Sequence, residues 1–195
     1  MRALRFLLFS LWLQKPWRLL LDMLWDDGMC FSGMSARLAA LKAKGLSLSG
    51  FRCSRDVFVS SGAIVSLPTQ GSIHIGPETF VGRQVYFDNH ARIEIGEGCL
   101  IGGFVRFLTA THDVETFELA CRPVRVGPFC WIGANVTILP GVTIGKGCII
   151  GAGSVVARDI PDWSIAYGVP CQPRRERPRP IRQRTATGRE VLLHE

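Results

Sequence analysis

Aliphatic residues recur every six positions through the second half of the chain. In "VGPFCWIGANVTILPGVTIGKGCIIGAGSV" each six-residue unit opens with Val or Ile, and glycine usually follows. Four places after the opening residue comes a small or β-branched side chain, such as Cys130, Val136 or Cys148. A period of six is too long for the alternation of one strand and does not fit the stripe of a helix. It predicts a solenoid of short strands with one turn per unit.

Three such units complete one coil if the opening residues point inward and stack on the coils above and below, with a rise of about 4.8 Å per coil. We expect glycine at the corners because it tolerates a positive φ without a Cβ clash. The repeat and its flanks predict a mainly β domain over residues 46–172, a helical segment over residues 1–45 and an irregular basic tail over residues 173–195. The opening residues are Ile75, Val81, Ile95, Ile101, Val126, Ile132, Ile138, Ile144, Ile150 and Val156.

Residues 1–25, "MRALRFLLFSLWLQKPWRLLLDMLW", are the most apolar part of the chain. Polar residues and a proline interrupt the run, so a membrane-spanning helix is not predicted. A secretory signal is disfavoured because no small-x-small cleavage site follows the run. Three tryptophans among Lys and Arg are typical of a helix lying in the membrane interface. Packing on the domain or on a neighbouring subunit is the alternative. The interrupting residues are Gln14, Lys15, Pro16 and Arg18.

The repeat slips by two residues before Ile95 and is lost between about Phe107 and Val126. A long loop leaving a solenoid costs closure entropy and usually serves function. The second loop begins "LTATHD", with His112 at its mouth. Histidine suits the role of general base for an alcohol near neutral pH when a second group fixes its tautomer. The candidates for that group are Asp113, Glu115, Glu118 and a backbone carbonyl.

The tandem repeat and the stretch "WIGANVTILPGVTIGKGCIIGAGSVVARDIPDWSIAYGVP" resemble the hexapeptide-repeat O-acetyltransferases of the galactoside, maltose and colanic-acid group. The resemblance covers roughly residues 57–172. It implies a left-handed parallel β-helix, which physics alone would not predict because crossover connections are usually right-handed. It also implies a homotrimer with its active sites between subunits, acetyl-CoA as donor, no metal, and a sugar hydroxyl as acceptor. An interfacial segment at residues 1–25 would suit a lipid-linked saccharide and a cytoplasmic protein peripheral on the inner membrane face.

The resemblance also assigns roles around the acceptor. His112 stands at the place of the family's histidine, which takes the proton directly from the sugar hydroxyl. Asp113 is the nearest carboxylate that would orient it. The earlier slip, "YFDNHARIE", places Asn89 and Asp88 one coil before His112, where relatives contact the acceptor sugar with a polar residue. Asn89 is the first choice for that contact and Asp88 the second.

For the donor, the resemblance implies that Trp131 lines the pantetheine channel and that the backbone of Ala152 contacts the pantetheine arm. Ala134 stands where some relatives have a serine near the thioester, so a hydroxyl contact is lost there. Arg158 and Arg175 match basic residues that face the phosphates of coenzyme A.

Charge and cysteine usage refine the picture. The formal charge of +7 comes from basic clusters near both ends, which suit phosphate groups, a membrane surface or nucleic acid. Nucleic acid ranks last, because no zinc knuckle, RNP-like strand or recognition-helix pattern is present. Gln172 replaces an arginine found in some relatives, so the contacts with the adenosine phosphates are expected to differ. The seven cysteines contain no Cys-x-x-Cys pair and read as reduced thiols, several of them in the small-residue slot of the repeat.

Two other function classes use this kind of fold. A γ-type carbonic anhydrase needs three converging histidines. This chain has only four, without the close pair that such a site requires: His74, His90, His112 and His194. A non-catalytic hexapeptide scaffold subunit is the other alternative, against which the histidine loop and the intact donor half argue. Serine acetyltransferases share the fold, but residues 1–45 are too short for their N-terminal domain. The sequence names neither the sugar, nor its hydroxyl, nor acetyl over a slightly larger acyl group.

Overall fold

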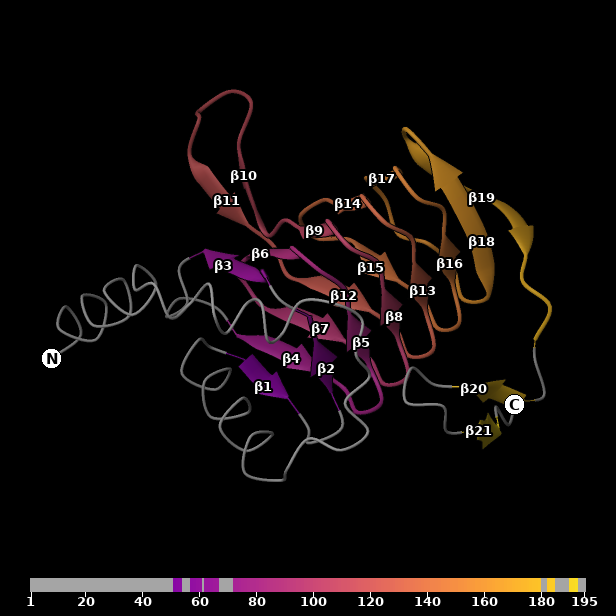
Figure 1. Cartoon of the computed structure of the whole chain (residues 1–195). Coiled ribbons are helices and arrows are strands. Elements are labelled where there is room, and N and C mark those ends of the chain that lie inside the picture. The colour runs from indigo at the N-terminus through magenta and orange to yellow at the C-terminus, as the bar shows by residue number, and fades with distance from the viewer. Residues whose placement is uncertain are drawn as a thin grey trace, which may run out of the picture. The chain divides into compact units, whose positions relative to one another are not determined.

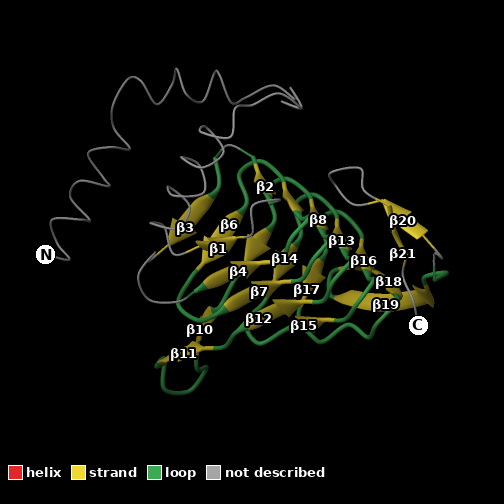
Figure 2. Ribbon diagram, turned by 90° about the horizontal axis from the view of Figure 1, so that it is seen from below, coloured by secondary structure: helices red, strands yellow, loops and turns green. Residues whose placement is uncertain are grey.

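The computed structural model describes residues 51–53, 57–60, 62–66, 72–179, 182–184 and 190–192. The helical segment predicted over residues 1–45, including the interfacial residues 1–25, lies outside them. Every element in this described part of the chain is a strand (Figures 1 and 2). No helix there is long and apolar enough to cross a membrane.

The described strands wind as a coil with three sheets as its sides. The first sheet contains β1 (Phe51–Cys53), β4 (Ile73–Ile75), β7 (Ile93–Ile95), β12 (Val124–Val126) and β15 (Thr143–Ile144). The second contains β2 (Phe58–Val59), β5 (Phe80–Val81), β8 (Leu100–Ile101), β13 (Trp131–Ile132), β16 (Ile149–Ile150), β18 (Ser164–Gly168) and β19 (Cys171–Glu176). The third contains β3 (Ile64–Ser66), β6 (Tyr86–Asp88), β9 (Arg106–Phe107), β14 (Thr137–Ile138) and β17 (Val155–Val156).

The chain visits the first, second and third sheets in turn, and each strand pairs in parallel with its counterpart one coil later. The predicted left-handed parallel β-helix is thereby confirmed. Besides the antiparallel strand β19 on the last coil, two antiparallel hairpins of the described residues depart from the coil pattern. They are β10 (Ala110–His112) with β11 (Leu119–Cys121), and β20 (Arg182–Arg184) with β21 (Glu190–Leu192).

The core consists of inward columns, one per sheet, as the repeat predicts. In the first sheet Ile75, Ile95, Val126 and Ile144 occupy the same register, and each is at most 3% exposed. In the third sheet the rings of Phe87 and Phe107 stack with their centroids 5.2 Å apart, and both are fully buried. Because every coil repeats the same inward position, a six-residue period is enough to build a continuous apolar core.

The recurrence of glycine after the opening residue of the unit has a different cause from the one expected. The glycines that follow the opening residues do not adopt positive φ; the left-handed turn residues come two places later, for example Asn135 at φ 60°. A Cβ atom on Gly133 would lie 2.6 Å from the backbone nitrogen of Ala152 in the next coil. These glycines are therefore required by the close approach of successive coils, and the positive-φ explanation is wrong for them.

The cysteines of the small-residue slot line one corner of the coil. Cys99, Cys130 and Cys148 are all buried, and their thiols donate to carbonyl oxygens of the following coil at 3.2, 3.0 and 3.0 Å. The hydrogen bond between the Cys148 and Cys130 thiols, together with burial, raises the pKa of Cys148 far above its ordinary value. Burial raises the pKa of Cys130 as well, so these two thiols stay neutral at physiological pH, and all three cysteines are buried packing groups, as the slot interpretation predicts.

The last coil carries an antiparallel addition. β19 pairs with β18, so residues 173–176, assigned from sequence to the tail, belong to a strand of the second sheet. The guanidinium of Arg177 donates to the carbonyls of Phe129 and Gly147 at 3.1 and 2.8 Å and lies over the ring of Trp163. The first residues of the predicted tail are therefore held against the coil.

Phe107→Ala tests the stacked core. Because Phe107 is fully buried and packs on Phe87, its truncation should lower the free energy of unfolding by about 3–5 kcal/mol. Phe58→Ala is the matched control, since Phe58 stacks on Phe80 at 5.1 Å but is 40% exposed. Urea denaturation should show less than half the loss in the control. Equal losses would contradict the assignment of the core to the inward column.

Candidate active site

Both breaks in the repeat occur at one corner of the coil, where the chain passes from the third sheet to the first. Residues 89–92 make this connection between β6 and β7, and residues 108–123 make it between β9 and β12. β12 nevertheless pairs with β7 in register, Val124 opposite Ile93. The longer loop therefore leaves the coil and returns without disturbing it. Its hairpin, β10 and β11, projects from the coil (Figure 1).

His112 ends strand β10 on this hairpin and is exposed. Its Nδ1 atom lies 2.8 Å from the backbone carbonyl oxygen of Phe117. A carbonyl oxygen only accepts, so Nδ1 carries the proton of the neutral ring and Nε2 carries the lone pair. Phe117 itself adopts a positive φ of 57°, which belongs to the turn that presents this carbonyl. Of the orienting groups that the sequence left open, a backbone carbonyl is the one in contact.

Asp113 has other partners in this geometry. Its carboxylate accepts from the backbone N–H groups of Thr116 and Glu115, at 3.0 and 2.9 Å, and from the Thr116 hydroxyl. These hydrogen bonds lower the pKa of Asp113. Its own N–H donates to the carbonyl of Glu118. Asp113 thus stabilises the tight turn that brings the Phe117 carbonyl to His112, and it acts on the histidine indirectly.

The carboxylate of Asp88 holds the base of the hairpin. One oxygen accepts from the backbone N–H groups of Thr109 and Ala110, at 3.2 and 3.1 Å. The other lies 2.5 Å from Nδ1 of His90 and accepts from the Ser66 hydroxyl at 3.1 Å. Burial raises the pKa of Asp88, but the hydrogen bonds from His90, Ala110, Thr109 and Ser66 outweigh it, and the net pKa is lowered.

Asn89 is fully buried, and its N–H donates to the Ser66 hydroxyl at 3.3 Å. The hydroxyl of Thr109 accepts from the N–H groups of His90 and Ala91, both at 3.1 Å, and donates to the carbonyl of Asp88. The corner at residues 88–91 and the start of the hairpin are therefore one hydrogen-bonded unit. The acceptor contacts predicted for Asn89 and Asp88 stay predictions, since both side chains are buried within one chain.

Trp131 lies on the outward face of the second sheet and is 51% exposed. It belongs to a row in which every parallel strand of that sheet, from β2 to β18, contributes an apolar outward residue. Leu100, one coil earlier, is 40% exposed. This face offers a wide apolar surface, in contrast to the charged outward face of the first sheet. The row comprises Phe58, Phe80, Leu100, Trp131, Ile149 and Ile165.

Ala134 and Ala152 occupy successive turns between the second and third sheets. The backbone nitrogen of Gly153 donates to the carbonyl of Ala134 at 2.9 Å, so these turns stack directly. Both alanines are exposed and leave backbone groups beside the row of Trp131. Small side chains at this corner admit a flexible chain close to the backbone.

Arg158 and Arg175 are exposed residues near the end of the coil. Arg158 follows β17 and lines a pocket formed by residues 157–160 and 170–173, which also includes Gln172. Arg175 lies on β19 opposite Ile165. Basic side chains thus gather at the last coil, where they suit anionic groups.

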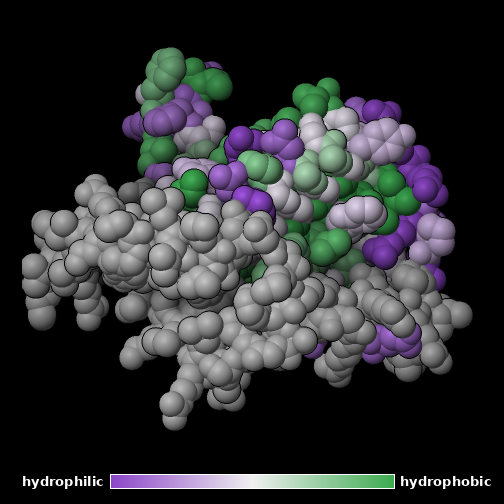
Figure 3. All heavy atoms as spheres, in the orientation of Figure 1, coloured by the Kyte–Doolittle hydropathy of each residue, from purple (hydrophilic) through white to green (hydrophobic). Residues whose placement is uncertain are grey.

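One chain does not bring the two halves of the predicted site together. His112 and Asp88 belong to the corner between the third and first sheets, whereas Trp131 lies on the second sheet, the side opposite that corner. Apolar side chains on the hairpin are also unusually exposed (Figure 3). These are Val114, Phe117 and Leu119, at 86%, 76% and 55%.

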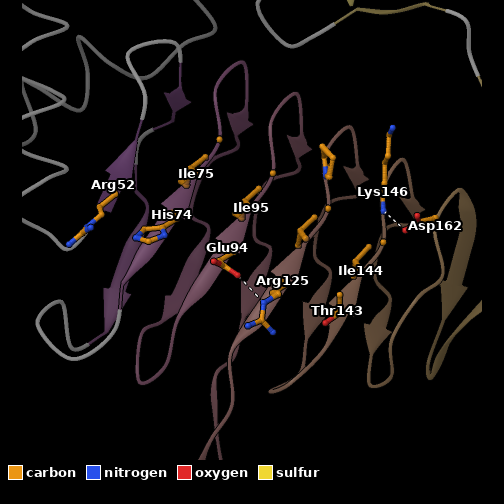
Figure 4. A pocket seen from close by; sticks show the side chains of 16 residues that line it. Arg52, His74, Ile75, Glu94, Ile95, Arg125, Thr143, Ile144, Lys146 and Asp162 are labelled. Atoms are coloured by element: carbon orange, nitrogen blue, oxygen red, sulfur yellow. Dashed lines mark hydrogen bonds and ion pairs between the residues drawn. The ribbon is translucent and has the colours of Figure 1, made fainter. Parts of the chain in front are cut away.

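A shallow pocket on the first sheet includes none of the predicted site residues. In this pocket Glu94 bridges Arg125 at 2.9 Å (Figure 4). Glu94 also pairs with Arg92 at 2.7 Å. Arg92 also donates to Nδ1 of His74 at 2.9 Å. Within the described ranges, no three His, Cys, Asp or Glu side chains gather as a metal site would need.

His90, Ser66, Thr109 and Phe117 are contacts that sequence reasoning did not select. Asp88 and Thr109 are 21 residues apart, and they meet only because the coil returns to the same corner. A register alignment of the coils across the two breaks would have placed residues 88–90 beside the base of the second loop. No sequence pattern predicts the turn that directs the Phe117 carbonyl toward His112.

Asp88→Asn tests the base of the hairpin through pH. A lowered pKa means that the folded state binds this proton less readily than the unfolded chain, so the carboxylate stabilises the fold above about pH 5 and loses this effect as the pH falls through the folded-state pKa. Asp88→Asn should be less stable than the wild type near pH 7 and should lose less stability between about pH 6 and pH 3. Urea denaturation at several pH values measures the difference.

Asp113→Asn is the matched control, because the pKa of Asp113 is also lowered but its carboxylate lies in an exposed turn. Because solvent screens the contacts of this exposed carboxylate, Asp113→Asn should change the pH dependence of stability less than Asp88→Asn does. If Asp88→Asn and the wild type lose the same stability on acidification, Asp88 does not hold the hairpin base in its ionised form.

Comparisons with known proteins identify the repeat. A family model described as bacterial transferase hexapeptide (six repeats) matches residues 123–158. The Mycobacterium tuberculosis protein named "Probable acetyltransferase Rv3034c" is 36% identical over 110 residues, which are 53% of this chain and 37% of that protein. The chain spans about half or less of the length of the curated relatives that it matches, from 37% to 53% for the first of them.

Two solved structures share the fold. The hexapeptide-repeat acetyltransferase VCA0836 of Vibrio cholerae, complexed with acetyl coenzyme A, is 31% identical with a TM-score of 0.65, over 73% of this chain and 79% of that one. A maltose O-acetyltransferase of Clostridium difficile 630 is 27% identical with a TM-score of 0.65, over 82% and 83% of the two chains. Taken with the parallel coil and its six-residue period, these similarities show that the chain belongs to the hexapeptide-repeat transferase family.

Proposed function

We propose that this protein is an acyl-CoA-dependent O-acetyltransferase that moves an acetyl group to a hydroxyl of a sugar or lipid-linked glycan, with His112 as general base. The observation that carries the proposal is the orientation of His112. Its Nδ1–H is committed to the Phe117 carbonyl, which leaves Nε2 as a base on an exposed hairpin that interrupts an otherwise regular coil. The similarity to an acetyltransferase bound to acetyl coenzyme A supports the donor.

The residues on the second sheet and its following corner fit coenzyme A. Trp131 and Leu100 supply exposed apolar surface for the pantetheine arm, and the small Ala134 and Ala152 leave the backbone accessible beside it. Arg158 and Arg175 lie farther along the coil, where they would meet the phosphates. Gln172 lines the pocket with Arg158, so an amide takes the place that some relatives give to an arginine.

The donor supplies a thioester carbonyl that a hydroxyl can attack. The part of His112 is to accept the proton of that hydroxyl at Nε2 as the oxygen becomes nucleophilic, a contribution of about 10²–10⁴ in rate for a well-placed base. The Phe117 carbonyl stabilises the resulting imidazolium, because it accepts from Nδ1–H throughout. The turn capped by Asp113 keeps that carbonyl in place.

A homotrimer would complete this site. The base and the donor surface lie on opposite sides of the coil, so one chain cannot bring them to the same acetyl group. The exposed apolar row of the second sheet is suited to burial against another copy, and the exposed Val114 and Leu119 of the hairpin are suited to the same purpose. We therefore assign the complete site to His112 of one chain and Trp131 of a neighbouring one.

The acceptor is proposed by analogy and by chemistry. The Clostridium difficile structure is a maltose O-acetyltransferase, which favours a sugar hydroxyl. A scaffold subunit would have no need for the oriented His112, and a γ-type carbonic anhydrase would need converging histidines. The peripheral membrane contact proposed for residues 1–25, with a lipid-linked acceptor on the cytoplasmic face, rests on their sequence alone.

His112→Ala tests the base. Turnover should fall by at least about a hundredfold, because general-base catalysis is lost, while coenzyme A binding should remain nearly unchanged. Turnover is measured as release of the coenzyme A thiol with a panel of free sugars and lipid-linked glycans. Coenzyme A binding is measured by calorimetry. His74→Ala is the control, since this histidine lies on the first sheet away from the hairpin. Unchanged turnover in His112→Ala would eliminate the proposed mechanism.

Trp131→Ala tests the donor surface. The loss of a half-exposed indole should weaken coenzyme A binding about tenfold, equivalent to about 1.4 kcal/mol, with little effect on folding. Leu100→Ala truncates the preceding residue of the same row and should have a smaller effect. If the two variants weaken coenzyme A binding equally, or if Trp131→Ala does not weaken it, the pantetheine arm does not bind against Trp131.

A further inference from the structure

We propose that His90 is a second acceptor-binding residue, which receives a hydrogen bond from an acceptor hydroxyl at its Nε2 atom. This inference rests on the proposed function and adds to it a contact that fixes which part of the acceptor faces His112. The observation that carries it is the Asp88–His90 pair at the base of the hairpin, in which Oδ1 of Asp88 and Nδ1 of His90 lie 2.5 Å apart.

The pair fixes the tautomer of His90. The pKa of Asp88 is lowered, so its carboxylate is ionised at neutral pH and acts only as an acceptor. Nδ1 of His90 must therefore be the donor in this contact. In the neutral ring Nε2 then carries the lone pair and can accept from a hydroxyl.

The same network also fixes where the ring stands. The N–H of His90 donates to the Thr109 hydroxyl at 3.1 Å, and Asp88 accepts from Thr109 and Ala110. Backbone and side chain of His90 are thus both tied to the strand that carries His112. Since these anchors are side chains and amides of a rigid coil, His90 is oriented before any ligand arrives.

His90 is the accessible member of residues 88–90. Its side chain is 23% exposed, against 11% for the side chain of Asp88, whose oxygens already have four partners. Asn89 is fully buried. A sugar reaching this corner would therefore meet the imidazole first, and Asp88 acts as the residue that positions it.

His90 is linked through Asp88 to the strand that carries the proposed base. Ala110, held by Asp88, lies two residues before His112 on β10, a step of roughly 6.6 Å along a strand. Side chains two residues apart in a strand point to the same face. A mono- or disaccharide is large enough to present one hydroxyl to His112 and a neighbouring hydroxyl to His90.

Two substitutions separate acceptor binding from a structural role. His90→Asn keeps an N–H near the position of Nδ1, so it can still donate to Asp88, but it has no atom at the position of Nε2. His90→Gln reaches the position of Nε2 with a polar group but does not match Nδ1. If His90 binds the acceptor, His90→Asn should raise the acceptor KM about tenfold, and His90→Gln should recover part of that loss. If His90 only supports the structure, His90→Gln should impair the enzyme more than His90→Asn, because only His90→Asn keeps the contact with Asp88.

The test measures initial rates of acetyl transfer with the best acceptor of the sugar and glycan panel, for the wild type, both His90 variants and His112→Ala. The KM for acetyl-CoA should be unchanged in His90→Asn, and its kcat should stay within a few-fold of the wild type. Urea denaturation of each variant accompanies the kinetics. If His90→Asn proves unstable, His90→Gln alone tests the proposal. Its acceptor KM must then be higher than that of the wild type, and an unchanged KM overturns the proposal.

The outcomes distinguish the two proposals. Acetyl transfer by the wild type with an unchanged acceptor KM in both His90 variants overturns this inference alone. A loss of kcat in His90→Asn as large as that in His112→Ala, at constant KM, also overturns it and makes His90 the base. A wild-type protein that acetylates no member of the panel overturns the proposed function, and the role of His90 with it.

Discussion

The fold depends on the short distance between successive coils. Parallel hydrogen bonding sets that distance at about 4.8 Å, and the backbones of neighbouring turns approach so closely that a Cβ atom on Gly96 or Gly133 would lie 2.5–2.6 Å from a backbone nitrogen. Units whose turns approach this closely must therefore present a glycine there, and each unit presents an apolar residue inward. This repeated requirement makes the coil rigid and leaves little room for variation within a strand or a tight corner.

Variation is confined to one corner for the same reason. Residues 89–92 and 108–123 both connect the third sheet to the first, and strand pairing continues across the longer insertion as if it were absent. Because the edge of the coil is rigid, a few hydrogen bonds at the base of a loop are enough to position that loop. Here the Asp88 carboxylate, which accepts from both Thr109 and Ala110, sets the direction of departure. The turn around Asp113 then sets the orientation of His112 at the far end.

The separation of the two halves of the site follows from the three-sided cross-section. A residue on the second sheet cannot face the same space as a residue at the corner between the third and first sheets. The Vibrio cholerae acetyltransferase that shares this fold is complexed with acetyl coenzyme A, and the exposed apolar row around Trp131 is the surface proposed here for such a donor. The proposed site therefore needs a second copy of the chain, with the rigid coil of each copy holding one half of it.

The sequence by itself determined the solenoid, its inward columns and the position of both breaks, because a six-residue period repeats one physical environment many times. It also singled out His112, which stands where the repeat breaks off. It predicted that Cys130 and Cys148 are buried, because they fill the small-residue position of the repeat. Only the tertiary structure decided the partners. The Phe117 carbonyl contacts His112 through a turn conformation that has no sequence signature. Asp88 reaches Thr109 because the coil returns one level higher to the same corner, and such a contact between distant residues follows from register, which local pattern does not encode.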